Sequence, residues 1–260
     1  MATPTVQRAD GDGRRRVPMP MVYRYLGDKR FAYTLPRAIS LQILHPGNAA
    51  SLVQHVHGGL WAHKSRAVGQ MVYIAYSNRD LRSVMRTAHS HVKGIDGRGA
   101  RYHSLNPELF FFQHATYVDT LLHSIDVFHG TLDADDKEQL YQECRRWYAK
   151  YDISDRAQPS TYTEFAEYFE DFCATQLSMT ADAERLRDET LHPPTWFPHR
   201  VPAPAIRAML HPRAAELLDV TVTGADRAAL RAFASATNVR VAVTLARYRL
   251  IPSARHAPDD

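Results

Sequence analysis

The sequence feature that most constrains the fold is the segment NPELFFFQHATYVDT, at residues 106–120. Asn106 suits the cap position of a helix, Pro107 suits its first turn, and Glu108 complements the positive end of the helix dipole. The segment therefore predicts a helix that begins at Pro107 and runs to about Phe128. Its apolar content is typical of a buried helix.

Apolar residues recur at helical spacing in most of the remaining chain. Helices are predicted over 31–56, with an interruption at 45–47, over 64–77 and over about 80–92. Further helix starts are indicated by capping residues at Thr131 or Asp133, at Thr161 with Glu164, and at Thr180, and two more helical stretches end at about Leu250. Gly94, Gly97 and Gly99 predict a loop, and Val220–Val222 and Val239–Val243 are ambiguous. Without convincing strand alternation or an internal repeat, the predicted fold class is all-α.

The composition predicts one sizeable core. The chain has 260 residues, of which 45% are hydrophobic. Residues 1–20 are polar and rich in Gly, Arg and Pro, so we expect a flexible N-terminal segment there and a single all-α domain over 21–260. Cys144 and Cys173 are expected to be buried thiols rather than a disulfide framework.

The charge pattern gives little indication of a macromolecular partner. The net charge of +4 comes from arginines spread along the chain, and we therefore expect no nucleic-acid partner. We also expect no transmembrane segment. The triplet Arg14–Arg16 is not followed by the apolar run of an export signal, so a cytoplasmic protein is expected.

One histidine of the 106–128 helix is a candidate ligand. His114 shares a helix face with aromatic and aliphatic residues at spacings of three, four and seven. A buried imidazole on such a face either forms a local hydrogen bond or binds a ligand, and the first is more common for a lone histidine. Haem is one such ligand: its iron would bind the imidazole, and apolar side chains would pack against the porphyrin. The neighbours on this face are Phe110, Phe111, Tyr117, Val118 and Leu121.

The preceding helix carries a polar stripe that faces away from its apolar side. Within it, Arg86, His89 and Ser90 lie within about one turn and are candidates for a buried site, whereas Arg82 and Lys93 are expected at a solvated surface. An arginine there could pair with a haem propionate, and the other two side chains could reach the far side of the iron.

Other metal and nucleotide chemistries have weaker support. A four-helix carboxylate site needs two Glu-x-x-His motifs, and Glu189-x-x-His192 is a single one that precedes a proline. The pairs His55/His57 and His89/His91 have a spacing of two, which places their rings on different helix faces. The sequence contains no HExxH, G-x-S-x-G or Walker motif.

Several segments in order resemble one known family. They are LQILHPGNAASLVQH, RTAHSHVKG, GARYHSLNPELFFFQHATYVDTLL, LDADDKEQLYQECRRW and LIPSARHAP, and the resemblance covers about residues 30–250. The chain resembles the catalytic domain shared by latex clearing proteins (rubber oxygenases) and the MpaB-type oxygenase of mycophenolic acid biosynthesis. The resemblance implies an all-α protein with a globin-like core that binds b-type haem.

The resemblance also implies roles for individual residues. His114 would be the proximal ligand of the haem iron, and Arg86 and Ser90 match an arginine and a hydroxyl residue that rubber-cleaving members need near the haem. His89 falls where those members can carry a lysine that caps the iron, so it is a possible distal ligand or an acid/base group. Position 70, where a glutamate base is expected by counting from Arg86, holds Gln70.

The expected function is that of a haem b-dependent oxygenase that uses dioxygen on a hydrophobic small molecule. Oxidative cleavage of a C=C bond or attack on an electron-rich ring are the expected reactions. A haem enzyme for dehydrogenation, hydroxylation or coupling with oxygen or peroxide is the alternative within the enzyme class. A haem-binding helical protein without turnover is the alternative outside it.

Overall fold

The computed structural model of the chain describes residues 19–77, 79–80 and 82–255. The predicted flexible segment at 1–20 lies outside this part of the chain except for its last two positions. As predicted, the described part is all-α, with one short hairpin added. The helices are α1 (Met21–Tyr25), α2 (Lys29–Leu44), α3 (Pro46–His55), α4 (Leu60–Tyr76), α5 (Arg82–His89), α6 (Pro107–Phe128), α7 (Ala134–Ala149), α8 (Tyr162–Gln176), α9 (Ala181–Leu191), a 3₁₀ turn η1 (Pro198–Arg200), α10 (Ala203–Met209), α11 (Pro212–Leu217), α12 (Gly224–Ala242), α13 (Ala246–Arg249) and α14 (Pro252–Arg255).

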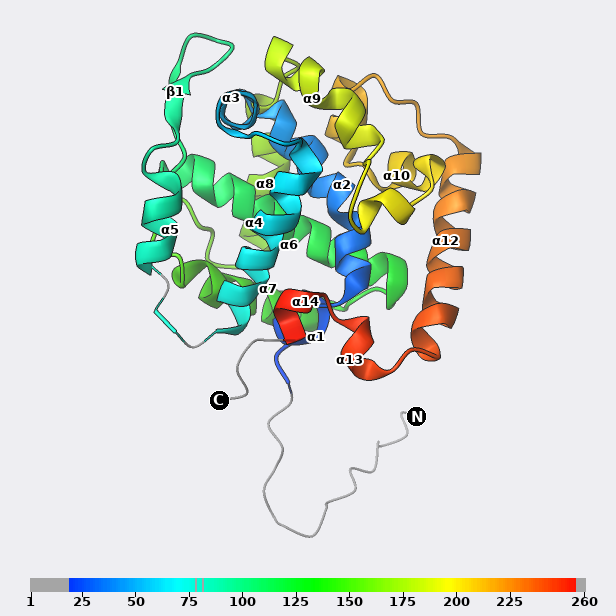
Figure 1. The fold of residues 1–260 in the computed structure, drawn as a ribbon. Helices are drawn as coiled ribbons and strands as arrows, with labels where there is room; N and C mark the ends of the chain where they lie inside the picture. Colours follow the sequence, from blue (N-terminus) through cyan, green and yellow to red (C-terminus); the bar gives the residue numbers. More distant parts are fainter. Residues whose placement is uncertain (1–18, 78, 81, 256–260) are drawn as a thin grey trace.

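Helices α2 and α6 cross at the centre of the molecule (Figure 1). Thirteen of the 16 residues of α2 are buried, among them the polar residues Thr34, Ser40 and Gln42, because other helices pack on several sides of it. Two polar links tie the crossing: Arg37 donates to both carboxylate oxygens of Asp119, at 2.7 and 3.0 Å, and Gln42 Nε2 donates to Thr116 Oγ1 at 2.7 Å. The other helices pack around this pair.

Most helix boundaries agree with the sequence prediction. The interruption at 45–47 separates α2 from α3, and Asp133, Thr161 with Glu164, and Thr180 cap α7, α8 and α9. Helix α4 begins four residues earlier than predicted, and α5 is shorter at both ends. Cys144 and Cys173 are buried free thiols in α7 and α8, as expected.

The predicted glycine loop after α5 is wrong in part, because it contains a short antiparallel hairpin. Strand β1 (Lys93–Ile95) pairs with β2 (Arg101–His103), so that Gly94 lies opposite Tyr102. A Cβ at Gly94 would lie 2.9 Å from Tyr102 Oη, which explains the glycine by close approach. Three-residue strands are too short to show an alternation pattern.

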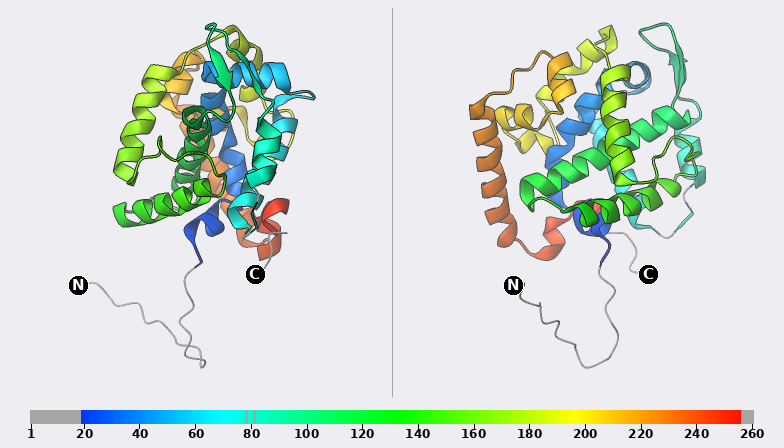
Figure 2. Two further views of the ribbon diagram at one scale, coloured as in Figure 1. Left: turned by 90° about the vertical axis from the view of Figure 1, so that its left-hand side faces the viewer. Right: turned by 180° about the vertical axis from the view of Figure 1, so that it is seen from behind.

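The C-terminal region has more helices than the two predicted. It forms α10 to α14, with Val220–Val222 outside any strand and residues 239–242 inside α12. Helix α12 packs on α10 along the edge of the molecule opposite α5 and the hairpin (Figures 1 and 2). The chain then returns, and Ile251 N–H donates to Gly27 C=O at 2.9 Å, which brings α14 beside α1 and against α4. None of the helices in the described ranges is long and apolar enough to cross a membrane.

Candidate functional site

A cavity of about 440 Å³ lies among α4, α5, α6 and the residue Tyr151 after α7. Its volume is in the usual range for small-molecule sites. The deep part is made by buried side chains, and exposed residues of α4 and α5 form its rim. The lining residues are His63, Lys64, Arg66, Ala67, Gln70, Met71, Ile74, Val84, Met85, Ala88, His89, Phe110, Gln113, His114, Tyr117 and Tyr151.

Helix α6 carries His114 into this cavity. The helix begins where the sequence predicts, because Asn106 Oδ1 accepts hydrogen bonds from the backbone N–H groups of Glu108 and Leu109, at 3.0 and 3.3 Å, and Pro107 occupies the first turn. These contacts satisfy donors that the helix itself leaves free. His114 lies two turns further along and is only 4% exposed.

The His114 imidazole is buried without a hydrogen-bond partner on either ring nitrogen among the described residues. Burial lowers its pKa to about 3; the nearby backbone carbonyl of Cys144 opposes this shift but does not reach hydrogen-bond geometry with either nitrogen. The ring is therefore neutral at physiological pH. An unpartnered buried polar group costs about 1–3 kcal/mol, so this arrangement suits a ring that binds something in the cavity.

His89 reaches the same cavity from α5. Its Nδ1 lies 2.9 Å from the backbone oxygen of Met85, which favours the tautomer that donates from Nδ1 and leaves Nε2 as an acceptor. Burial lowers the pKa of the ring, and the Met85 oxygen opposes that shift. A histidine held in this way by a backbone carbonyl is oriented either for metal ligation or for proton transfer at Nε2.

The remaining predicted residues divide between the cavity and its surroundings. Phe110 and Tyr117 line the cavity with His114 and His89. Phe111 and Val118 are buried but are not among the lining residues; Phe111 packs on Tyr148 and Tyr168 instead. Arg86, Ser90 and the predicted surface residues Arg82 and Lys93 are exposed and also lie outside the lining, and Arg86 pairs with Asp152 at 2.9 Å.

Sequence reasoning missed the contribution of α4. His63, Lys64 and Arg66 line the cavity together with the apolar residues Met71 and Ile74. Lys64 lies at spacings of seven and ten from these two residues, on one helix face, and that spacing could have revealed it. The predicted helix began at position 64, which made Lys64 resemble an end residue. Gln70 lines the rim, so the departure from a glutamate base falls at the cavity itself.

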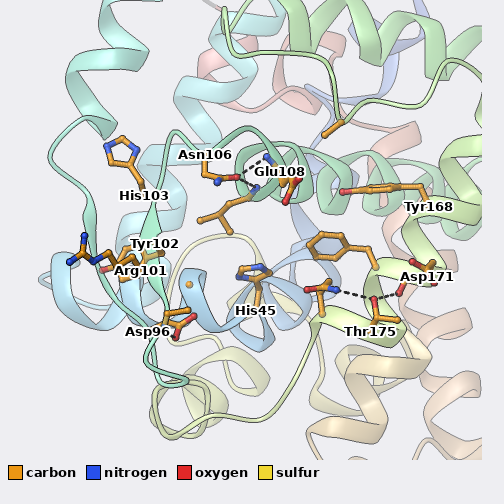
Figure 3. Close-up of a pocket in the computed structure, with 16 residues that line it drawn as sticks. His45, Asp96, Arg101, Tyr102, His103, Asn106, Glu108, Tyr168, Asp171 and Thr175 are labelled. Atoms are coloured by element: carbon orange, nitrogen blue, oxygen red, sulfur yellow. Dashed lines mark hydrogen bonds between the residues drawn. The ribbon is translucent and has the colours of Figure 1, made fainter.

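A second and larger cavity, of about 730 Å³, lies beside the hairpin and α8 (Figure 3). Its lining mixes aromatic residues with exposed carboxylates such as Glu108 and Asp171, and His45 stacks on Phe172 at 5.9 Å between ring centroids. Volume alone would favour this cavity as the site. We favour the smaller one, because it holds His114, the buried imidazole with two unpartnered nitrogens.

The alternative metal motifs are not assembled in the structure. Among the residues that the structure describes, no three His, Cys, Asp or Glu side chains form a group that could hold a metal ion. Glu189 accepts from the backbone N–H of Trp61, and His192, the residue after α9, pairs with Asp188 of that helix. A haem, by contrast, needs from the protein only one axial imidazole and apolar walls.

The fold is all-α, and the cavity between its helices is largely apolar and contains a buried, unpartnered imidazole. These features define an all-α protein with a small-molecule site between its helices. Comparison with family models assigns the chain more closely. Residues 23–239 match the model of the "ER-bound oxygenase mpaB/B'/Rubber oxygenase, catalytic domain" family. The chain belongs to this family and carries an oxygenase catalytic domain. Comparisons with curated proteins and with solved structures give no match.

Proposed function

We propose that this protein is a haem b-dependent oxygenase that acts on a hydrophobic small molecule, with His114 as the proximal ligand of the iron. The observation that carries the proposal is the His114 ring, which is neutral, buried and unpartnered at both nitrogens on the wall of a cavity. Haem ligation requires such a ring, and Phe110, Tyr117 and Ile74 supply apolar contacts of the kind that a porphyrin needs. The residues present therefore fit the group.

When bound, the haem would supply the activation of dioxygen. The protein's own residues would do the rest. Buried side chains such as Met71 and Phe110 exclude water and hold a hydrophobic substrate. His89, oriented by Met85, accepts or returns a proton at Nε2 in this role, because burial keeps the ring in its neutral form. Cleavage of a C=C bond or attack on an electron-rich ring is the proposed reaction.

One residue favours a second candidate reaction. Gln70 stands at the rim where the resemblance places a glutamate base, and an amide cannot abstract a proton. Dehydrogenation, hydroxylation or coupling by the same haem, with a base other than Gln70, is therefore the second candidate. Comparison of Gln70→Glu with the wild type tests it: a gain of C=C cleavage would indicate that the wild-type reaction differs.

The absorption spectrum of the purified protein, with pyridine haemochrome analysis, tests the proposed cofactor. We expect a Soret band and the haemochrome of b-type haem, and oxygen consumption with hydrophobic substrates. A colourless preparation from haem-replete cells that also fails to take up haemin would contradict the proposal. Haem uptake without turnover on any substrate would indicate a haem-binding protein instead.

A further inference from the structure

Lys64 of α4 is a buried lysine on the wall of the cavity of about 440 Å³ that contains His114, which we call the central cavity. It is 4% exposed, in a position where lysine is rare unless a counter-charge accompanies it. In the described part of the chain, no carboxylate lies within ion-pair distance of its amine. The proposed oxygenase chemistry makes no use of this residue.

A fixed chain of hydrogen bonds orients the amine. Lys64 Nζ donates to Gln42 Oε1 at 2.7 Å, and Gln42 Nε2 donates to Thr116 Oγ1 at 2.7 Å. The Thr116 hydroxyl hydrogen is used toward the backbone oxygen of Gln113, at 2.7 Å, so its oxygen must accept from Gln42. The Gln42 amide is thereby held with its oxygen toward Lys64. An ammonium has three N–H donors, of which this contact uses one.

The groups around Lys64 do not balance a positive charge. Burial lowers the pKa of His63 to about 4 and that of His114 to about 3, and it also lowers the pKa of His89, so all three rings are neutral at physiological pH. Arg66 is exposed at the rim and adds a further positive charge. Without a counter-charge, burial lowers the pKa of Lys64 to about 7. The cavity therefore favours a ligand that brings one negative charge.

We propose that Lys64 is the anion-binding residue of the central cavity and pairs with a single carboxylate of the molecule that occupies it. The inference rests on the proposed function only in taking this cavity as the ligand site. A carboxylate fits better than a phosphate dianion, because one buried ammonium matches one charge and the nearby walls, including Met71 and Ile74, are apolar. Two sources share this chemistry: a haem propionate, and the carboxylate of an amphiphilic substrate.

The first experiment titrates haem-free protein with haemin and with haemin dimethyl ester. If a propionate is the source, the wild type should prefer haemin by about 10- to 100-fold, which is the value of one buried charge-assisted hydrogen bond. Lys64→Met and Lys64→Gln should lose this preference. Lys150→Met is the matched control, because Lys150 is half-buried outside the cavity and donates to the backbone oxygens of Ala75 and Ser77. The control should keep the preference.

The second experiment measures the affinities of dodecanoate and of dodecanol for the haem-free and the haem-loaded protein by calorimetry. If the substrate carries the carboxylate, dodecanoate should bind at least 10-fold more tightly than dodecanol, and only when Lys64 is present. If the wild type takes up no haemin, the proposed function fails, and the dodecanoate measurement on haem-free protein still tests Lys64.

Equal affinities in wild type and Lys64→Met for all four compounds would overturn the inference. Circular dichroism checks that each variant is folded. If a variant is not folded, the affinities of the wild type for haemin and for its dimethyl ester can still be compared. A preference that is present in wild type but survives in both Lys64 variants would also overturn it, because another residue would then bind the carboxylate.

Discussion

The His114 ring of α6 lies edge-on against the indole of Trp147 in α7, with ring centroids 4.3 Å apart and 65° between the planes. Tyr148 and Tyr151 enclose it further, at 5.1 and 5.9 Å. Aromatic packing, rather than a hydrogen bond, therefore holds this imidazole in place. No hydrogen bond among the described residues occupies its two nitrogens, while the ring itself is fixed.

The first prediction is that His114→Ala loses haem. Removal of the proximal bond should weaken haem retention by well over 10-fold and remove or shift the Soret band, while the fold survives with a weakened core. His123→Ala is the matched control, since His123 is largely buried on the same helix, near Arg37 and Asp119, and is not among the cavity-lining residues. Full haem occupancy in His114→Ala would show that another residue is the ligand of the haem iron.

The second prediction separates the two roles of His89. If Nε2 of His89 acts as an acid/base group, His89→Ala should lower turnover by about 10²- to 10⁴-fold and leave the ferric spin state nearly unchanged. If it is a distal ligand, the resting ferric protein should be low-spin and His89→Ala should shift it to high spin. We expect the first result. Electron paramagnetic resonance of wild type and variant decides between them.

The third prediction concerns the two arginines that could pair with a propionate at the surface. Arg66 lines the rim of the cavity, whereas Arg86 lies outside the lining and pairs with Asp152. We therefore expect Arg66→Ala to weaken haem binding by about 2- to 5-fold, as is usual for an exposed charge pair, and Arg86→Ala to change it less. The rate of haem transfer to apomyoglobin measures how firmly each variant retains haem. A larger effect of Arg86→Ala would restore the role that the sequence suggests for it.

The fourth prediction is a pH dependence of stability in the haem-free protein. The pKa of Lys64 is about 7 in the folded state, against 10.5 without burial. Below about pH 7 the lysine is protonated in both states, so the folded state bears the full cost of a buried charge. Between about pH 7 and 10.5 the unfolded state binds more protons, so the free energy of unfolding rises with pH, on the order of 5 kcal/mol in total.

Lys64→Met should lack this rise and should be more stable than wild type at pH 6. Its loss of the hydrogen bond to Gln42 offsets about 1 kcal/mol of the gain. Urea unfolding of wild type and Lys64→Met from pH 6 to 10 measures the difference between their free energies of unfolding. The titration of groups that both proteins share cancels in this difference. Parallel curves over the whole range would mean that Lys64 is solvated or paired in the haem-free state.

The helix starts were predictable because their causes are local. Asn106, Asp133 and Thr180 each cap a helix through a backbone N–H two or three residues away, so a short segment of sequence contains the whole interaction. The hairpin at 93–103 was missed, because its three-residue strands depend on pairing across a turn and leave no periodic pattern. The short C-terminal helices α10 and α11 are likewise too brief for a clear period.

The sequence by itself determined the fold class, the family and the placement of His114 on a buried aromatic face, since period and capping are properties of one helix. Only the tertiary structure decided which side chains share a cavity. It brings His89 and His114 together, adds Lys64 from α4, and leaves Arg86 outside the lining. The physical reason is that a cavity depends on how helices distant in the sequence cross, and that arrangement follows from the packing of the whole core.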